Sequence, residues 1–373
     1  MHAPKACAQA TEETVIQGRG TDQRPRRDGG ANAGHAAGTA GQGHMIWVPG
    51  GSFLMGSNDF YPEERPVRRE SVRGFWMDSH PVTNAEFRQF VSATGYATYS
   101  ERPPDSATYP HADPSLLVPG SLVFRKPRGP VGLRDYRAWW EYVPGADWRH
   151  PEGPGSTLNG RDDHPVVHVA YEDACAYADW AGKALPIESE WEFAARGGLE
   201  GATYAWGDAF APEGRAMANT WQGRFPWQNL EVDGYEGTSP VKAFPANGYG
   251  LYDMIGNVWE WTASSFAPRR AEDIKKSCCV PSEPGGHIAR RVVKGGSHLC
   301  APNYCLRYRP AARQGEAVDT SACHIGFRCV VRVSKIAVER PQRALALKPA
   351  AQSAAASSFS LRKFEERQVN ERM

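Results

Sequence analysis

Only three short segments of this chain keep the hydrophobic spacing of a helix. They cover residues 84–95, 171–182 and 188–198, and each runs into a glycine that would end the helix. The rest of the chain is dense in turn-forming residues, with 38 Gly and 29 Pro, and in large aromatic anchors, with 12 Trp. A chain of this kind cannot be built from long helices or long strands. We therefore expect an α+β fold, a single compact domain with little regular secondary structure.

Composition divides the 373 residues into three parts. Residues 1–43 are rich in Gly, Ala, Arg and Asp and have no hydrophobic period, so we expect a disordered leader. Residues 44–335 carry most of the apolar and aromatic side chains and form the predicted domain. Residues 336–373 are rich in Ala, Ser, Gln and charged side chains, which predicts a flexible tail.

Two further segments of the domain carry local signals. Residues 45–56, MIWVPGGSFLMG, form two apolar runs around a Pro-Gly-Gly turn, which is a hairpin signature. Residues 100–165 are Pro-rich and have no clear period, so we expect a long ordered loop. The side chains expected to hold that loop are Trp139, Trp140 and Trp148. The remainder of the domain reads as short strands and turns.

Charge and hydropathy restrict the partners and the compartment. The formal net charge is +1, which gives no reason to expect nucleic acid or an acidic membrane as a partner. No stretch approaches the about 18 apolar residues of a membrane-spanning helix, and the N-terminus lacks the apolar core of a secretory signal. We therefore expect a cytoplasmic protein, with a monomer as the default state. The cysteines are too few and too uneven for a disulfide scaffold. They are Cys7, Cys175, Cys278, Cys279, Cys300, Cys305, Cys323 and Cys329.

Cys300 and Cys305 lie on one tight loop, where their thiols can converge on a single point. Their spacing alone leaves several interpretations open. A local disulfide would close a very small loop and add little stability. A zinc site would need two more ligands, and the spacings to Cys323 and Cys329 are not those of zinc motifs. Buried structural thiols, a reactive pair or a two-thiolate site for a soft metal also fit the spacing.

Longer motifs around this loop resemble the formylglycine-generating, sulfatase-modifying-factor family over nearly all of residues 45–333. The GGS-x-x-C-x4-C signature of its catalytic branch stands here as Gly295, Gly296, Ser297, Cys300 and Cys305. The other matching motifs are GGSFLMG at 50–56, HPVTNAEFRQF at 80–90, WRHPEGPGS at 148–156, HPVVHVAYEDACAYADWAGKALPIESEWEFAARGG at 164–198 and NGYGLYDMIGNVWEWT at 247–262. The resemblance implies the C-type-lectin-like fold of that family.

The activity that the resemblance implies is a copper-dependent oxidation. Cys300 and Cys305 would hold one Cu(I) ion through thiolates, which suit a soft ion. The expected substrate is the cysteine of a Cys-x-Pro-x-Arg motif in an unfolded sulfatase polypeptide, whose thiolate becomes the third copper ligand. With O2 and a thiol reductant, that cysteine is converted to Cα-formylglycine. The resemblance also places Ser297, Tyr304 and Trp259 in the active site, at the oxygen pocket and along the peptide groove.

Each supporting residue also has a plainer interpretation. Ser297 follows two glycines and could simply cap a turn. Trp259 and Trp261 alternate with Glu260 as in a half-buried strand, so at least one of the two indoles is expected in the core. Tyr304 lies between the two loop cysteines, which favours a functional role.

Two structural calcium ions follow from the same resemblance. The first set of ligands is Asn219, Thr220, Asp233 and Tyr235. The second set is Asp253, Gly256, Val258 and Glu260. In these sets Thr220, Tyr235, Gly256 and Val258 would contribute only backbone carbonyls, and the others hard side-chain oxygens. The alternative is that Asp233 and Glu260 are ordinary solvated or ion-paired acids.

The chain departs from the family pattern outside the signature. Pro310 stands where secreted members carry a cysteine, and the second helix has Cys175 three residues earlier than theirs. We therefore expect those disulfides to be absent, with Cys329 as an alternative contact for Cys175. Ala301 replaces a larger residue after Cys300, which would change peptide contacts.

Two other classes of function are weighed against this one. A non-catalytic paralogue that binds peptides or glycans would have lost one or both loop cysteines, and this chain keeps both. An iron-dependent sulfoxide synthase would need a further N-terminal domain with a histidine cluster. The residues before 45 are too few for such a domain and contain only His2, His35 and His44.

Overall fold

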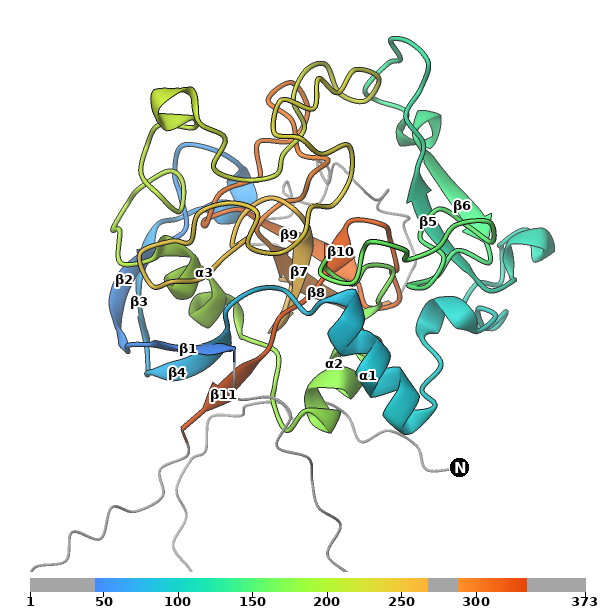
Figure 1. Cartoon of the computed structure of the whole chain (residues 1–373), viewed down its shortest axis with the longest axis horizontal. Helices are drawn as coiled ribbons and strands as arrows, with labels where there is room; N and C mark the ends of the chain where they lie inside the picture. Colours follow the sequence, from blue (N-terminus) through green and yellow to red (C-terminus); the bar gives the residue numbers. More distant parts are fainter. Residues whose placement is uncertain (1–43, 268–287, 334–373) are drawn as a thin grey trace, which may run out of the picture. The chain divides into compact units, whose positions relative to one another are not determined.

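The computed structural model describes residues 44–267 and 288–333 (Figure 1). The predicted leader and tail, with Cys7, Cys278 and Cys279, lie outside the described residues. The α+β prediction is confirmed: the described helices are α1 (Asn84–Thr94), α2 (Tyr171–Trp180) and α3 (Glu188–Arg196). In this part of the chain no helix is both long and apolar enough to cross a membrane.

The strands are short. They are β1 (Met45–Val48), β2 (Gly51–Met55), β3 (Arg68–Val72), β4 (Phe75–Asp78), β5 (Gly120–Phe124), β6 (Trp140–Pro144), β7 (Trp259–Ser265), β8 (Arg290–Lys294), β9 (Arg313–Ala317), β10 (Ile325–Gly326) and β11 (Val330–Arg332).

A four-stranded sheet lies in the middle of the fold, in the order β10-β7-β8-β9. β10 runs parallel to β7, and the other neighbours are antiparallel. Figure 1 shows this sheet between α3 on one side and α1 with α2 on the other. A second sheet, β1-β4-β11, pairs strands from the two ends of the described chain. The pairs β2-β3 and β5-β6 complete the strands.

The hairpin predicted for residues 45–56 is wrong in its pairing. Both strands exist, but β1 pairs with β4 and β2 pairs with β3. The Pro-Gly-Gly turn therefore carries the chain from one sheet to another. Glycine is needed there, because a Cβ at Gly50 would lie 2.7 Å from the amide nitrogen of Gly74. The apolar runs identify the strands, whereas the partners come from more distant sequence.

The long loop predicted for residues 100–165 contains a hairpin that the sequence did not reveal. β5 and β6 pair antiparallel from Gly120↔Pro144 to Phe124↔Trp140. Trp139 and Trp148 are buried, as expected for anchors, while Trp140 is half-buried. Proline at the end of β6 and the absence of strict alternation concealed these strands.

Capping interactions mark the helix ends, and glycines end α1 and α3 as predicted. At the start of α1, the hydroxyl of Thr83 accepts a hydrogen bond from the amide of Glu86, and the Glu86 carboxylate accepts one from the amide of Thr83. Gly95 ends the helix with φ 66° and Gly197 ends α3 with φ 57°, a conformation that favours glycine. α2 stops two residues before Gly182, with Ala181 as its C-cap.

Strand β7 is more deeply buried than its alternating sequence predicts. Trp259 and Trp261 both lie in the core, which confirms that at least one is a core residue. Glu260 between them is also fully buried, so the strand is covered on both faces. Arg328 neutralises this acid at 2.7 Å and is itself fully buried.

Candidate active site

The two signature cysteines lie on the connection between β8 and β9, next to the central sheet. The connection begins with two glycines that the local packing requires. A Cβ on Gly295 would lie 2.9 Å from the carbonyl oxygen of Met254, and one on Gly296 would lie 2.7 Å from the carbonyl oxygen of Arg307. Both glycines also have positive φ, 94° and 71°. The Gly-Gly pair thus lets the loop fold back on its own exit.

Two tight turns bring the thiols together. The amide of Cys300 donates to the carbonyl of Ser297 at 2.9 Å, and the amide of Cys305 donates to the carbonyl of Ala301 at 2.8 Å. The two sulfur atoms are 3.1 Å apart, and both cysteines are reduced and 2% exposed. The spacing argument that the thiols converge on one point agrees with this geometry.

The surroundings of the pair argue against a zinc site. Within the described residues, no group of three or more His, Cys, Asp and Glu side chains could hold a metal ion. Cys323 accepts a hydrogen bond from the amide of Phe124, and the amide of Cys329 donates to Asp78. A structural zinc would need four ligands, and the described residues supply no His, Cys, Asp or Glu beside the pair to complete that number. Among the described cysteines no disulfide joins Cys175 and Cys329.

The three supporting residues named from the sequence lie around the pair in different ways. Ser297 is fully buried, and its amide lies 3.5 Å from the sulfur of Cys300. Its hydroxyl also accepts from the amide of Leu299, so the turn-capping interpretation holds too. The Tyr304 ring stacks on Phe225 with ring centroids 4.6 Å apart. Trp259 belongs to the same buried cluster as both cysteines.

Two neighbours of the loop carried no signal in the sequence. Tyr308 is buried, and burial, with help from Tyr204 and the two cysteines, raises the pKa of its hydroxyl. His298 is buried two residues before Cys300, and burial lowers the pKa of its imidazole to about 4, so it is neutral at pH 7. The spacing of isolated Tyr and His residues does not predict burial, so only the fold identifies them.

A third group of neighbours comes from the other end of the chain. The short segment Phe60–Glu64 lies against the exit of the cysteine loop and hydrogen-bonds to it. The segment contains two consecutive acids, Glu63 and Glu64, which pair with Arg307 and Arg309 about 245 residues away in sequence. No local pattern indicates such a contact.

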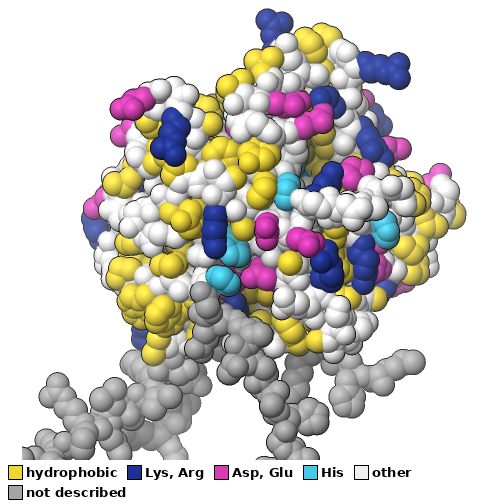
Figure 2. Space-filling view, viewed as in Figure 1, with side chains coloured by type: hydrophobic (Ala, Val, Ile, Leu, Met, Phe, Trp, Pro, Cys, Tyr) yellow, Lys and Arg dark blue, Asp and Glu magenta, His cyan; other side chains and the backbone are white. Residues whose placement is uncertain are grey.

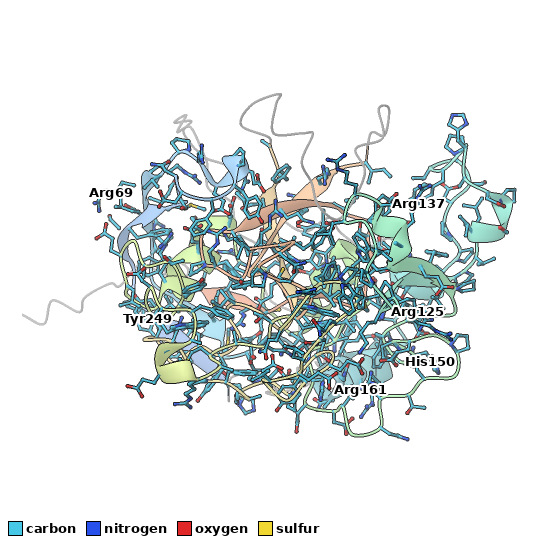
Figure 3. The ribbon with its side chains drawn as sticks, turned by 90° about the horizontal axis from the view of Figure 1, so that it is seen from above. Arg69, Arg125, Arg137, His150, Arg161 and Tyr249 are labelled. Carbon is cyan, nitrogen blue, oxygen red and sulfur yellow. The ribbon has the colours of Figure 1, made fainter. Side chains whose placement is uncertain are left out.

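A cavity of about 490 Å³ opens beside the loop, but neither Cys300 nor Cys305 lines it. His298 and Leu299 form one part of its wall, and Arg125 and Arg161 form another. Figure 3 shows these two arginines on the same side of the molecule, near His150. On the face drawn in Figure 2, basic, acidic and histidine side chains are interspersed rather than separated.

The first predicted calcium set has features that suit a cation. Asp233 accepts hydrogen bonds from the amides of Thr220 and Tyr235 at 3.3 and 3.2 Å. Burial raises the pKa of its carboxyl, and no ion pair to Asp233 is formed within the described residues. The buried hydroxyl of Thr220 has no hydrogen-bond partner there either. Asn219 lies next to these groups and donates to the carbonyl of Gly237.

The second predicted set is arranged differently. Both carboxylate oxygens of Glu260 accept hydrogen bonds from Arg328, at 2.7 and 2.8 Å, and one also accepts from Trp191. The same guanidinium donates to the carbonyl of Asp253 at 3.2 Å. In this arrangement the charge of Glu260 is already balanced, so its side chain does not fit the role of a calcium ligand. Gly256 and Val258 stand beside it on the loop that leads into β7.

Comparison with known proteins gives a consistent result. Residues 33–333 match the family model described as sulfatase-modifying factor enzyme 1-like domain. A formylglycine-generating enzyme of Mycobacterium tuberculosis is 57% identical over 290 residues, which is 77% of this chain and 97% of that relative. One of Thermomonospora curvata is 48% identical over 291 residues, 76% of this chain and 92% of that relative.

Two further matches bear on fold and on activity. A mouse protein named inactive C-alpha-formylglycine-generating enzyme 2 is 40% identical over 301 residues, 79% of this chain and 87% of that relative. Among solved structures, PvdO of Pseudomonas aeruginosa is 25% identical with a TM-score of 0.50, and the match covers 78% of this chain and 94% of that one. The matched range 33–333 contains every residue that the structure describes.

Proposed function

This chain belongs to the sulfatase-modifying factor family, and from that premise we propose that it is an oxidase that converts the cysteine of a Cys-x-Pro-x-Arg motif in sulfatases to Cα-formylglycine. The observation that carries the proposal is the buried pair of reduced thiols, with sulfur atoms 3.1 Å apart, on the signature loop. Relatives at 57% and 48% identity are named formylglycine-generating enzymes. A non-catalytic paralogue would have no need for this pair.

Cu(I) is the metal whose chemistry fits the donors. Two buried thiols, with no third His, Cys, Asp or Glu ligand beside them among the described residues, suit a soft ion of low coordination number and disfavour zinc or a hard cation. When bound by Cys300 and Cys305, copper would supply the one-electron and oxygen chemistry that no side chain of the chain supplies. The low exposure of both cysteines would protect the thiolates from bulk solvent.

The overall reaction balances with O2 and a two-electron thiol reductant. The substrate side chain changes from –CH2SH to –CHO, and its sulfur leaves as H2S. O2 accepts two electrons and two protons from the substrate and two of each from a pair of reductant thiols, which become a disulfide. This four-electron reduction converts O2 to two waters, and one water is consumed when the oxidised substrate carbon is hydrolysed to the aldehyde with release of H2S, so the net by-product is one water.

The chain's own side chains would bind and orient the peptide and keep water out. Tyr304 and Phe225 present stacked rings beside the second cysteine, an apolar wall suited to the proline of the motif. Trp139 packs edge-on against the same tyrosine, with ring centroids 5.6 Å apart. Ser297 would fix the first cysteine, since its amide points to the sulfur.

The partner, the compartment and the oligomeric state complete the proposal. The substrate is an unfolded sulfatase polypeptide, because the motif must reach a buried thiol pair as an extended segment. Cytoplasmic location and a monomeric state remain predictions from the sequence. We also propose a structural Ca²⁺ ion at Asn219, Thr220, Asp233 and Tyr235, supported by the carboxylate without an ion pair and the unpartnered hydroxyl among the described residues. Calcium at Asp253 and its neighbours remains a prediction.

Incubation of the copper-loaded protein with a Cys-x-Pro-x-Arg peptide, O2 and a thiol tests the activity. We expect the peptide mass to fall by the difference between –CH2SH and –CHO, and expect this loss to be absent in Cys300→Ser and Cys305→Ser. Cys175→Ser, which changes a buried thiol outside the loop, is the matched control and should retain conversion. An unchanged peptide with the intact protein would leave the binding-protein interpretation.

A further inference from the structure

Two side chains hold the exit of the cysteine loop: Tyr61 from a distant segment and Arg309 from the same connection. Leu306 directly follows Cys305, and its amide donates a hydrogen bond to the hydroxyl oxygen of Tyr61 at 2.9 Å. Its carbonyl accepts from the Nε of Arg309 at 2.7 Å. Both polar groups of this one residue are therefore bound by side chains rather than by a sheet or a helix.

The turns that hold the two cysteines do not reach this far. The two turns described above tie Cys300 to Ser297 and Cys305 to Ala301, and both end at or before Cys305. Strand β9 begins only at Arg313. Between these points the backbone makes two local hydrogen bonds, from Arg309 to Arg307 and from Ala312 to Arg309, and its arginine side chains pair with a distant segment. Directly after Cys305, the distant segment contributes the hydrogen bond that Tyr61 accepts from the amide of Leu306.

Tyr61 is itself fixed by a buried, charge-balanced group of side chains. The guanidinium of Arg307 lies 3.8 Å from the centroid of the Tyr61 ring and pairs with Glu63. Arg309 pairs with Glu64 through two hydrogen bonds and lies over the ring of Phe60. The four charged residues are at most 8% exposed, so each acid offsets one guanidinium away from water. We refer to Phe60–Glu64 with Arg307 and Arg309 as the exit clamp.

We propose that Tyr61, supported by the exit clamp, is a positioning residue for Cys305 and sets its sulfur at the distance from Cys300 that the site requires. The inference rests on the proposed two-thiolate copper site. A hydroxyl that fixes the peptide unit after a ligand restricts the backbone of that ligand, as outer hydrogen bonds do at metal sites. Loss of the hydroxyl would leave the Leu306 amide without this acceptor and let the second thiol move.

Tyr61→Phe tests this directly, because it removes the hydroxyl and keeps the ring that lies against Arg307. Tyr96→Phe is the matched control: it removes a hydroxyl that donates to Asp173 of α2, outside the exit clamp. Cu(I) affinity is measured by competition with a chromogenic Cu(I) chelator without O2. We expect Tyr61→Phe to bind copper about tenfold more weakly or worse, the range found for outer partners of metal ligands, and Tyr96→Phe to bind like the parent protein.

A second measurement needs no metal. The alkylation rates of Cys305 and Cys329 by iodoacetamide are read together by peptide mass spectrometry in the metal-free protein. We expect Tyr61→Phe to accelerate alkylation of Cys305 about fivefold, the factor for a lost hydrogen bond of about 1 kcal/mol, and to leave Cys329 unchanged. Equal acceleration at both cysteines would indicate general destabilisation and overturn the positioning role.

The two measurements separate this inference from the proposed function. Copper affinity and Cys305 alkylation both equal to the parent protein would refute a role for Tyr61. A parent protein that binds no Cu(I) would refute the copper site, and the alkylation rates would still decide whether the exit clamp positions the thiol. Weaker copper binding together with selective alkylation of Cys305 would support the proposal.

Discussion

Replacement of Arg328 by Met should destabilise the protein strongly through the acid it leaves behind. Arg328 and Glu260 are both fully buried and share two hydrogen bonds of 2.7 and 2.8 Å. Removal of one partner from a buried ion pair costs about 4 kcal/mol, because the remaining charge stays in a medium of low dielectric. Trp191 would be the remaining donor to the Glu260 carboxylate among the contacts described above.

The assay is urea unfolding followed by fluorescence, with Glu260→Gln and the double variant beside Arg328→Met. The double variant carries no buried charge at this site, and the amide of Glu260→Gln keeps an acceptor for Trp191. We therefore expect the double variant to recover about half or more of the unfolding free energy that Arg328→Met loses. A loss below about 1 kcal/mol in Arg328→Met, or a double variant no more stable than the single one, would refute the reasoning. Recovery of Arg328→Met by calcium would instead assign a metal to Glu260.

Three other predictions concern stability. Burial lowers the pKa of His168 from 6.5 to about 4, so the folded state binds fewer protons than the unfolded state. Stability therefore falls as the pH drops below 6.5. Urea unfolding should show that this group costs about 2 kcal/mol of unfolding free energy between pH 7 and 5, and His168→Asn should lack this loss. Thr83→Ala should lower the unfolding free energy by about 1 kcal/mol, whereas Thr83→Ser keeps the cap and should lie close to the parent; equal losses would contradict the capping role. Calcium at a hundred times its dissociation constant should stabilise the protein by about 2.7 kcal/mol in thermal unfolding, and Asp233→Asn should lose this response; a response that persists would place the ion elsewhere.

Local sequence signals predict those parts of the fold that local interactions determine. The start of α1 at Thr83 and the ends of α1 and α3 at Gly95 and Gly197 follow from capping chemistry within a few residues. The convergence of the two loop thiols follows from their spacing and from the glycines before them. These features need no knowledge of the rest of the chain.

Contacts between distant segments could not be predicted in the same way. β1 looks like one half of a hairpin, but its partner β4 is chosen by the packing of the whole sheet. Tyr61 and its acidic neighbours meet the cysteine loop across about 245 residues of sequence. The alternating sequence of β7 predicts that Glu260 is exposed. Its burial is possible because Arg328, which is distant in sequence, neutralises its carboxylate.

The central claim is that Cys300 and Cys305 together form a copper site that carries out the oxidation. The most direct test is to load the metal-free protein with increasing fractions of one Cu(I) per chain and to measure peptide conversion at each step. The account predicts conversion in proportion to copper occupancy up to one ion per chain, and neither stoichiometric binding nor conversion in Cys300→Ser or Cys305→Ser. Full conversion by the metal-free protein, or by either variant, would contradict it.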